Sequence, residues 1–280
     1  MPRAPAMEQL HQRQPGITRR ALARGRDAAG RSSYALLAEL VTPGSRVLDL
    51  GCGDGVLLEL VASRGGVGVG IDCSAAELAL ARQAGATVVR AEAAALPLRA
   101  GSFDLVLSHL AFSVMDDAEA VVAQIDRVLA APGCFAAVVG GGPALPASTG
   151  RQPDRQIDGE PDRQDQPTED GFEVFLSLLG EALTGRARCR LGDRRAGRPE
   201  GWRALWHARG YQVTWERHAI DLSGTLDEVW LTLASAYDMT LLSPEQTQGL
   251  ARRFAEECGR RFAERIPVTM VVWRAMAERG

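Results

Sequence analysis

Residues 46–55 of this chain read RVLDLGCGDG, and this stretch decides the fold. Its first five residues are mostly apolar, which predicts a short buried strand. The glycines that follow let the backbone turn tightly and come close to a ligand. Residues 55–63 predict a helix, whose first N–H groups have no partner within the helix. A strand, a glycine loop and a helix in this order indicate a cofactor site at the end of a strand.

The spacing of the glycines distinguishes two kinds of cofactor site. A dinucleotide fingerprint has the pattern G-x-G-x-x-G. The glycines here follow G-x-G-x-G instead, and Val56 stands in the place of the third dinucleotide glycine. Asp49 lies just before the loop, where a carboxylate repels a pyrophosphate but accepts hydrogen bonds from an ammonium group. The spacing therefore favours a site for S-adenosyl-L-methionine (SAM) over one for a nicotinamide dinucleotide.

Two more acidic residues follow the next two expected strands. Asp72 ends the second strand, 21 positions after Gly51, where a carboxylate accepts both hydroxyl groups of a ribose. The third strand is followed by Glu92 and Ala93, which suit the edge and face of an adenine. Taken singly, each acid also fits a helix cap or a solvated loop. Three acids at the ends of successive strands favour a binding site, because ligands of open α/β sheets bind at that edge.

The chain alternates strand and helix patterns over most of its length. We expect strands at residues 46–50, 67–71, 87–90, 103–108, 134–139, 211–222 and 267–274. We expect helices at residues 55–63, 74–84, 117–130, 172–183, 200–209, 226–239 and 244–265, with Ser74 as an N-cap. Strands separated by helices pair in parallel through right-handed crossovers. The expected fold class is therefore α/β, a doubly wound, mostly parallel sheet.

The pattern also divides the chain into segments. Residues 1–44 are expected to form an N-terminal helical cap, of which about the first 16 residues form a loose, solvated terminus that includes His11. Residues 45–140 form the cofactor-binding core, and residues 141–171, rich in Gly, Pro, Gln and Asp, form a flexible loop. Residues 172–280 complete the core and carry helical lid insertions at about 172–190 and 225–265.

Several stretches resemble the class I SAM-dependent methyltransferases, in particular the small-molecule enzymes related to the ubiquinone and menaquinone methyltransferases. They are RVLDLGCGDG (46–55), GVGID (68–72), EAAALPL (92–98), GSFDLVLS (101–108) and DRVLAAPG (126–133). The resemblance is good from Arg46 to about Val139 and weaker over 202–221 and the last strand. It is specific for fold and cofactor and unspecific for substrate.

The resemblance implies a seven-stranded sheet whose last strand is antiparallel. It also implies that Asp49, Gly51 and Gly53 surround the methionine portion of SAM, that Asp72 holds the ribose, and that Glu92 and Ala93 lie at the adenine. The family often has Asp where Glu92 stands, but the longer side chain keeps the acceptor. We also assign to the cofactor site the neighbouring residues Cys52 and Cys73, together with Ser108 at the end of the fourth strand.

Methyl transfer needs an aligned nucleophile and, for some acceptors, a base, but no protein nucleophile. His109 follows the fourth strand and is the candidate catalytic base, since its ordinary pKa suits that role. Tyr34 precedes the first strand, and Trp230 and Tyr237 fall in the second insertion; all three are candidate substrate-binding residues. The alternative for these four residues is simple packing in the core or in the insertion.

Composition narrows the function classes. The chain has 280 residues, 46% of them hydrophobic, and a net charge of −3, which disfavours general nucleic-acid binding. No apolar run is long enough to span a bilayer, and the first residues have no apolar signal core. Five widely spaced cysteines without a CxxC pair indicate neither a metal site nor a disulfide framework, which fits a reducing cytoplasm.

These observations predict a cytoplasmic SAM-dependent methyltransferase that acts on a small molecule in specialised metabolism or quinone-like biosynthesis. Oxygen is the first choice of acceptor atom, and nitrogen and carbon stay open. The rival hypotheses are a nicotinamide-dependent oxidoreductase and a SAM-fold partner protein without methyl transfer. The substrate and the oligomeric state are left open by the sequence.

Overall fold

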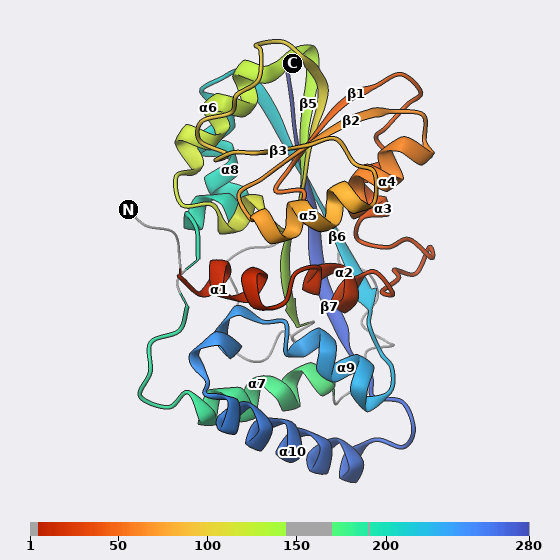
Figure 1. The fold of residues 1–280 in the computed structure, drawn as a ribbon, viewed down its shortest axis with the longest axis vertical. Coiled ribbons are helices and arrows are strands. Elements are labelled where there is room, and N and C mark those ends of the chain that lie inside the picture. The colour runs from red at the N-terminus through yellow and green to blue at the C-terminus, as the bar shows by residue number, and fades with distance from the viewer. Residues whose placement is uncertain (1–4, 144–169, 190, 280) are drawn as a thin grey trace.

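The computed structural model describes residues 5–143, 170–189 and 191–279 (Figure 1). The strands are β1 (Arg46–Leu50), β2 (Val67–Asp72), β3 (Val88–Arg90), β4 (Phe103–His109), β5 (Leu129–Pro143), β6 (Tyr211–Asp221) and β7 (Thr269–Arg279). The α-helices are α1 (Pro5–Arg13), α2 (Ile17–Leu22), α3 (Ala35–Ala38), α4 (Val56–Ser63), α5 (Ala75–Gln83), α6 (Ala118–Val128), α7 (Gly171–Ala182), α8 (Pro199–His207), α9 (Leu226–Leu233) and α10 (Pro244–Arg261). Three short 3₁₀ helices are η1 (Phe112–Val114), η2 (Arg194–Gly197) and η3 (Tyr237–Leu241).

The seven strands form one sheet in the order β3-β2-β1-β4-β5-β7-β6. The first five strands pair in parallel, and β7 is antiparallel to both β5 and β6. The order reverses between β1 and β4, and ligands of doubly wound sheets bind at the carboxyl ends of the strands near such a reversal. The prediction of a mostly parallel seven-stranded sheet with an antiparallel last strand is confirmed.

Side chains of β1 alternate between two apolar cores, one on each face of the sheet. Val47 packs in the core that includes α3 and α4, whereas Leu48 and Leu50 pack in the core that includes α6 and α8. This alternation follows from the two-residue period of a strand. Burial on both faces explains why β1 reads as a nearly continuous apolar run.

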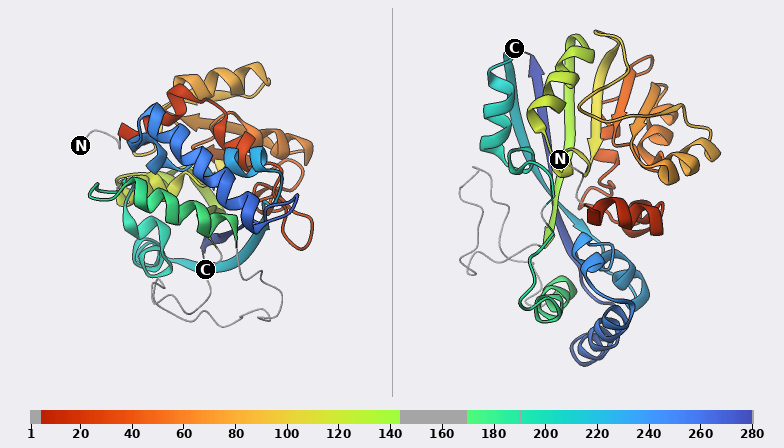
Figure 2. Two further views of the ribbon diagram at one scale, coloured as in Figure 1. Left: turned by 90° about the horizontal axis from the view of Figure 1, so that it is seen from below. Right: turned by 60° about the vertical axis from the view of Figure 1, so that its left-hand side comes forward.

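A group of helices lies beyond the carboxyl-end edge of the sheet. The helix group, as we call α7, α9, η3 and α10, is held together by packing of α7 on α10 and α9. Figures 1 and 2 show it set apart from the upper part of the sheet, with β5, β6 and β7 reaching toward it. Helices α1 and α2 lie between the two parts and pack on η3 and α9. The chain thus surrounds the edge where the predicted cofactor site lies.

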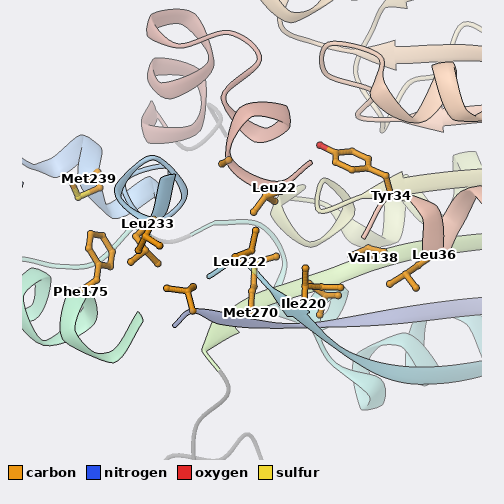
Figure 3. Packing of buried hydrophobic residues seen from close by; sticks show 14 of the residues in the cluster. Leu22, Tyr34, Leu36, Val138, Phe175, Ile220, Leu222, Leu233, Met239 and Met270 are labelled. Atoms are coloured by element: carbon orange, nitrogen blue, oxygen red, sulfur yellow. The ribbon is translucent and has the colours of Figure 1, made fainter. Parts of the chain in front are cut away.

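One apolar core continues from the sheet into the helix group. Figure 3 shows Val138 and Met270 of the sheet in the same layer as Leu22 of α2, with Leu233 and Phe175 of the helix group farther along. All five side chains belong to one buried cluster. The helix group is therefore joined to the sheet by buried apolar contact, which fixes its position over the sheet edge.

The structure corrects several expected boundaries. Strand β5 begins at Leu129, since it pairs with Phe103 before the expected start, and it continues to Pro143 along β7. The flexible loop expected at 141–171 falls mainly on 144–169, outside the described residues. At its ends the expectation is wrong, because Gly141 lies in β5 and the side chain of Asp170 caps α7. Ser74 caps α5 as predicted, accepting a hydrogen bond from the Glu77 N–H.

The loose N-terminus expected at residues 1–16 is also wrong over its described part. Residues 5–13 form α1, which packs on α5 and η3. Glu77 of α5 accepts hydrogen bonds from the Gly16 N–H and lies 2.7 Å from Nδ1 of His11. A buried carboxylate with such partners anchors the segment, which local composition did not indicate.

Candidate functional site

The glycine loop sits at the centre of the site because of a close approach. Gly51 follows β1 with a φ of 76°, and its N–H donates to the carbonyl oxygen of Ile71 at the end of β2. A Cβ at Gly51 would lie 2.3 Å from the Cβ of Ala111, which follows β4. Only glycine fits here, since a side chain would collide and this backbone region is unfavourable for other residues. The loop therefore holds the ends of β1, β2 and β4 close together.

Asp49 is a buried carboxylate with an unpaired oxygen. It is 1% exposed, lines the cavity at the sheet edge, and its Oδ2 has no hydrogen-bond partner in the described part of the chain. Burial, with the nearby charges of Asp72 and Asp54, raises the pKa of Asp49 to about 8. An unpaired buried carboxylate is unfavourable by itself, and a cationic partner would relieve it. The ammonium group of a methionine moiety is such a partner.

The neighbouring acid, Asp54, has its partner within the protein. Its carboxylate lies 2.7 Å from Nε of Arg19, the residue of α2 that also pairs with Glu59. Its charge is therefore balanced without a ligand. The contrast shows that the unpaired oxygen of Asp49 is a particular feature of that position and not of every acid in the loop.

Asp72 connects the loop to the end of β2. Its Oδ2 accepts from the Gly53 N–H at 3.0 Å, and its Oδ1 accepts from the Ser74 N–H at 2.8 Å. A carboxylate has about four acceptor positions, so two remain for ligand hydroxyls. The two backbone bonds fix the orientation of the carboxylate at the cavity, which it also lines. This geometry suits the predicted ribose contact.

Most of the other predicted cofactor residues line the same cavity, which has a volume of about 930 Å³. They are Gly51, Cys52, Gly53, Cys73, Glu92 and Ala93. Ser108 is different, because it lies outside the cavity lining and is fully buried. Its hydroxyl donates to the Leu50 carbonyl oxygen and accepts from the Phe112 N–H. Ser108 therefore ties β4 to β1 and to the following turn.

His109 and Tyr34 form one unit in the wall of the cavity. Their rings stack with centroids 3.7 Å apart, and both residues are buried and line the cavity. Nε2 of His109 lies 2.8 Å from Oγ of Ser33. Burial lowers the pKa of His109 to about 3, so its imidazole is neutral in the physiological range. Burial also raises the pKa of Tyr34, so its phenol is neutral too.

The two aromatic residues of the second insertion have different places. Tyr237 lines the cavity, its hydroxyl lies 3.4 Å from Nε2 of His11, and burial raises its pKa to about 12. Trp230 is absent from the lining and packs against Phe175 and Phe254 within the helix group. The structure thus brings Tyr237 to the candidate site and gives Trp230 the packing role that the sequence left as the alternative.

Sequence reasoning missed the N-terminal wall of the cavity. Leu10 and His11 of α1, Gly16 and Glu77 all line it. Glu77 stands three residues after an N-cap, which reads as an ordinary capping pattern. Its partners Gly16 and His11 are more than 60 residues away, and no local signal connects them.

The described residues contain no group of three or more His, Cys, Asp or Glu side chains arranged to hold a metal ion. None of the helices in the described ranges combines the length and the apolar character that crossing a membrane requires.

Comparison with known proteins identifies the central part of the chain. Residues 48–137 match the family model of a methyltransferase domain. A malonyl-[acyl-carrier protein] O-methyltransferase of Enterobacter lignolyticus is 37% identical over 155 residues, 54% of this chain and 61% of that protein. A ubiquinone biosynthesis O-methyltransferase of Hahella chejuensis is 40% identical over 98 residues, 32% of this chain and 41% of that protein. The chain therefore matches less than two thirds of the length of these relatives.

Solved structures agree on the fold. The YcgJ protein of Bacillus subtilis superposes with a TM-score of 0.53 at 16% identity, covering 88% of this chain and 97% of that one. A putative methyltransferase of Bacillus halodurans gives 0.52 at 16% identity, with the same coverage. Residues 48–137 thus match a methyltransferase domain, and the described chain shares the fold of these solved structures.

Proposed function

We propose that this chain transfers a methyl group from SAM to an oxygen atom of a small-molecule acceptor. One observation carries the proposal: the buried carboxylate of Asp49 has an oxygen without a hydrogen-bond partner in the described part of the chain, and it lies beside a glycine loop in which a Cβ on Gly51 would collide with Ala111. That arrangement fits a cationic amino acid group and opposes a pyrophosphate, which argues against the nicotinamide alternative. The two O-methyltransferases among the relatives support oxygen as the acceptor atom.

In this proposal, different residues of the cavity contact different portions of SAM. In the proposal, Asp49 and the loop around Gly51 and Gly53 hold the methionine portion, and Asp72 holds the ribose. Cys52 and Cys73 flank these contacts, and Glu92 and Ala93 lie at the adenine end. Bound SAM supplies a methyl group on a positively charged sulfur. The surrounding apolar side chains exclude water, which strengthens the pairing between buried charges.

His109 is proposed to contact the acceptor, with Tyr34 and Tyr237 as further walls of its site. A neutral imidazole accepts a hydrogen bond from an acceptor hydroxyl and so orients its oxygen. Bound SAM would supply the methyl group to this oxygen, and His109 would take up the hydroxyl proton and pass it on to solvent when the site opens. With a pKa near 3, His109 holds that proton only briefly. Its role is therefore orientation and transient acceptance more than storage of a proton.

The proposal includes a cytoplasmic location and a role in specialised metabolism or quinone-like biosynthesis. None of the five cysteines forms a disulfide in the described part of the chain, which is consistent with a reducing compartment. The relative named for ubiquinone biosynthesis supports a biosynthetic role.

Calorimetry with SAM, S-adenosylhomocysteine and NAD tests the cofactor. We expect binding of the first two and none of NAD; binding of NAD alone would overturn the proposal. Methyl transfer is tested with radiolabelled SAM and a panel of phenols, alcohols and amines, with formation of S-adenosylhomocysteine as the readout. SAM binding without transfer to any acceptor class would instead favour the partner-protein alternative.

A further inference from the structure

The cavity has two chemically different parts. Around the loops that follow β1, β2 and β3 it is polar. Toward the helix group it is lined by apolar side chains from four elements or their ends, and we call this part the acceptor chamber. Its walls are Leu110, Phe172, Leu176, Leu179, Leu233 and Met270. All six belong to, or pack against, the apolar core that Figure 3 shows in part.

The charges on the cavity wall are strongly unequal. Eight of its lining residues are Asp or Glu, whereas Arg90 is the only Lys or Arg among the described residues that line it. Arg90 ends β3, on the adenine side, and its Nε donates to the carbonyl oxygen of Cys73. The described walls of the acceptor chamber therefore offer no cation to pair with an acidic group.

The titratable residues nearest to the acceptor chamber do not supply a positive charge that would offset the acidic residues of the cavity wall. His109 and Tyr34 are buried and neutral, for the reasons given above. Asp238 of η3 is paired with Arg188 at 2.8 Å and accepts from the Cys189 N–H. A buried anion without a cationic or hydrogen-bonding partner is strongly unfavourable. The acidic residues elsewhere on the cavity wall add repulsion to that cost.

We propose that the acceptor is an uncharged molecule with an apolar body, presented to the site through a neutral hydroxyl, and that carboxylates and phosphates are excluded. The inference rests on the proposed methyl transfer and narrows its substrate class. It excludes acceptors that carry a free carboxylate, such as a malonyl group, as substrates of this chain. The six apolar side chains favour an acceptor with an apolar body, and the excess of acidic residues among the described residues of the cavity wall disfavours anions.

Matched pairs of probes test the inference. The full chain is saturated with S-adenosylhomocysteine and titrated at pH 7.5 with 4-propylphenol and with 4-propylbenzoate, which share an apolar body and differ in charge. Octan-1-ol and octanoate form a second pair. We expect each neutral probe to bind at least about tenfold more tightly than its anion, roughly 1.4 kcal/mol. Equal or tighter binding of the anions would overturn the inference, and so would failure of both neutral probes to bind.

A variant reverses the expected preference. Leu176→Arg places a guanidinium on the chamber wall, and we expect it to improve 4-propylbenzoate binding about tenfold while weakening 4-propylphenol. The control is Leu231→Arg on α9, where the side chain is 36% exposed and outside the lining; it should leave both affinities unchanged. An unchanged preference in folded Leu176→Arg would contradict the placement of the chamber.

The binding of S-adenosylhomocysteine itself is measured first and separates the two proposals. If it fails to bind, the proposed function fails, and the inference fails with it. If it binds and the probes show no charge preference, only the acceptor class is wrong. The comparison of probes on the unchanged chain does not depend on whether a variant folds.

Discussion

The raised pKa of Asp49 predicts that SAM affinity depends on pH. Below pH 8 the carboxyl group of the free protein is mostly protonated, because burial opposes its charge. If the ammonium group of SAM binds the ionised form, a proton must leave Asp49 before the pair can form. Affinity is therefore expected to fall as the pH drops below 8. At higher pH the amine of SAM loses its own proton, so affinity should fall on that side too.

The size of the effect follows from the two titrations. With Asp49 and the SAM amine both titrating near pH 8, the paired charge states coexist in about a quarter of encounters at pH 8 and in about one hundredth at pH 6. The ratio is about 25-fold, or about 2 kcal/mol. The estimate applies when Asp49 stays ionised in the complex at pH 6, which the adjacent ammonium favours.

Calorimetry of SAM binding at pH 6, 7, 8 and 9 tests this reasoning. The unchanged chain should bind most tightly near pH 8 and release protons on binding at pH 6. Asp49→Asn keeps the volume and removes the titration, so its weaker affinity should vary less than about twofold between pH 6 and 7. A flat pH profile in the unchanged chain, or an equally steep fall in affinity below pH 8 in the Asp49→Asn variant, would refute the assignment of Asp49 to the ammonium.

Three further changes probe other parts of the site. Asp72→Ala should weaken SAM binding at least tenfold by calorimetry, since hydrogen bonds to a charged group contribute about 1.5–3 kcal/mol each; unchanged affinity would contradict the ribose contact. His109→Gln should lower kcat by about 10²-fold at constant SAM affinity, and the unchanged chain should show no His109 limb near neutral pH, because its pKa is about 3. Trp230→Ala should cost about 3 kcal/mol of stability in urea titration, from lost packing of this half-buried ring on Phe175 and Phe254. SAM affinity should be preserved, and lost affinity in the folded variant would place Trp230 at the site instead.

The cofactor half of the site could be predicted because its signals are local. Asp49, the glycine loop and Asp72 each stand at the end of a strand that the sequence marks by its apolar run. The parallel pairing of β1 with β2, Asp49 opposite Gly70, then brings them together without further information. The parallel pairing in the sheet could be anticipated from the same alternation, and the resemblance supplied the seven strands and the antiparallel β7; the order of the strands was not predicted.

The N-terminal wall could not be predicted, because its stabilising contacts are long-range. Glu77 receives the Gly16 N–H and contacts His11 across more than 60 residues. The terminus looks polar and loose in isolation, and the buried carboxylate that orders it looks like part of a helix cap. Trp230 and Tyr237 likewise have a similar sequence context. Only tertiary packing places the Trp230 side chain against Phe175 inside the helix group and directs the Tyr237 side chain to the cavity.

The matched methyltransferase domain ends before most of the residues that wall the acceptor chamber. The domain match covers residues 48–137, which hold the glycine loop, Asp72, Glu92 and His109. Phe172, Leu176, Leu179, Leu233 and Met270 all lie after it and come from α7, α9 and β7. A shared domain can therefore carry the same cofactor chemistry while the chamber varies independently, since function depends on the site and not on the fold alone. For this chain, the domain match informs the methyl donor, the names of the relatives support oxygen as the acceptor atom, and the walls of the chamber inform the body of the acceptor.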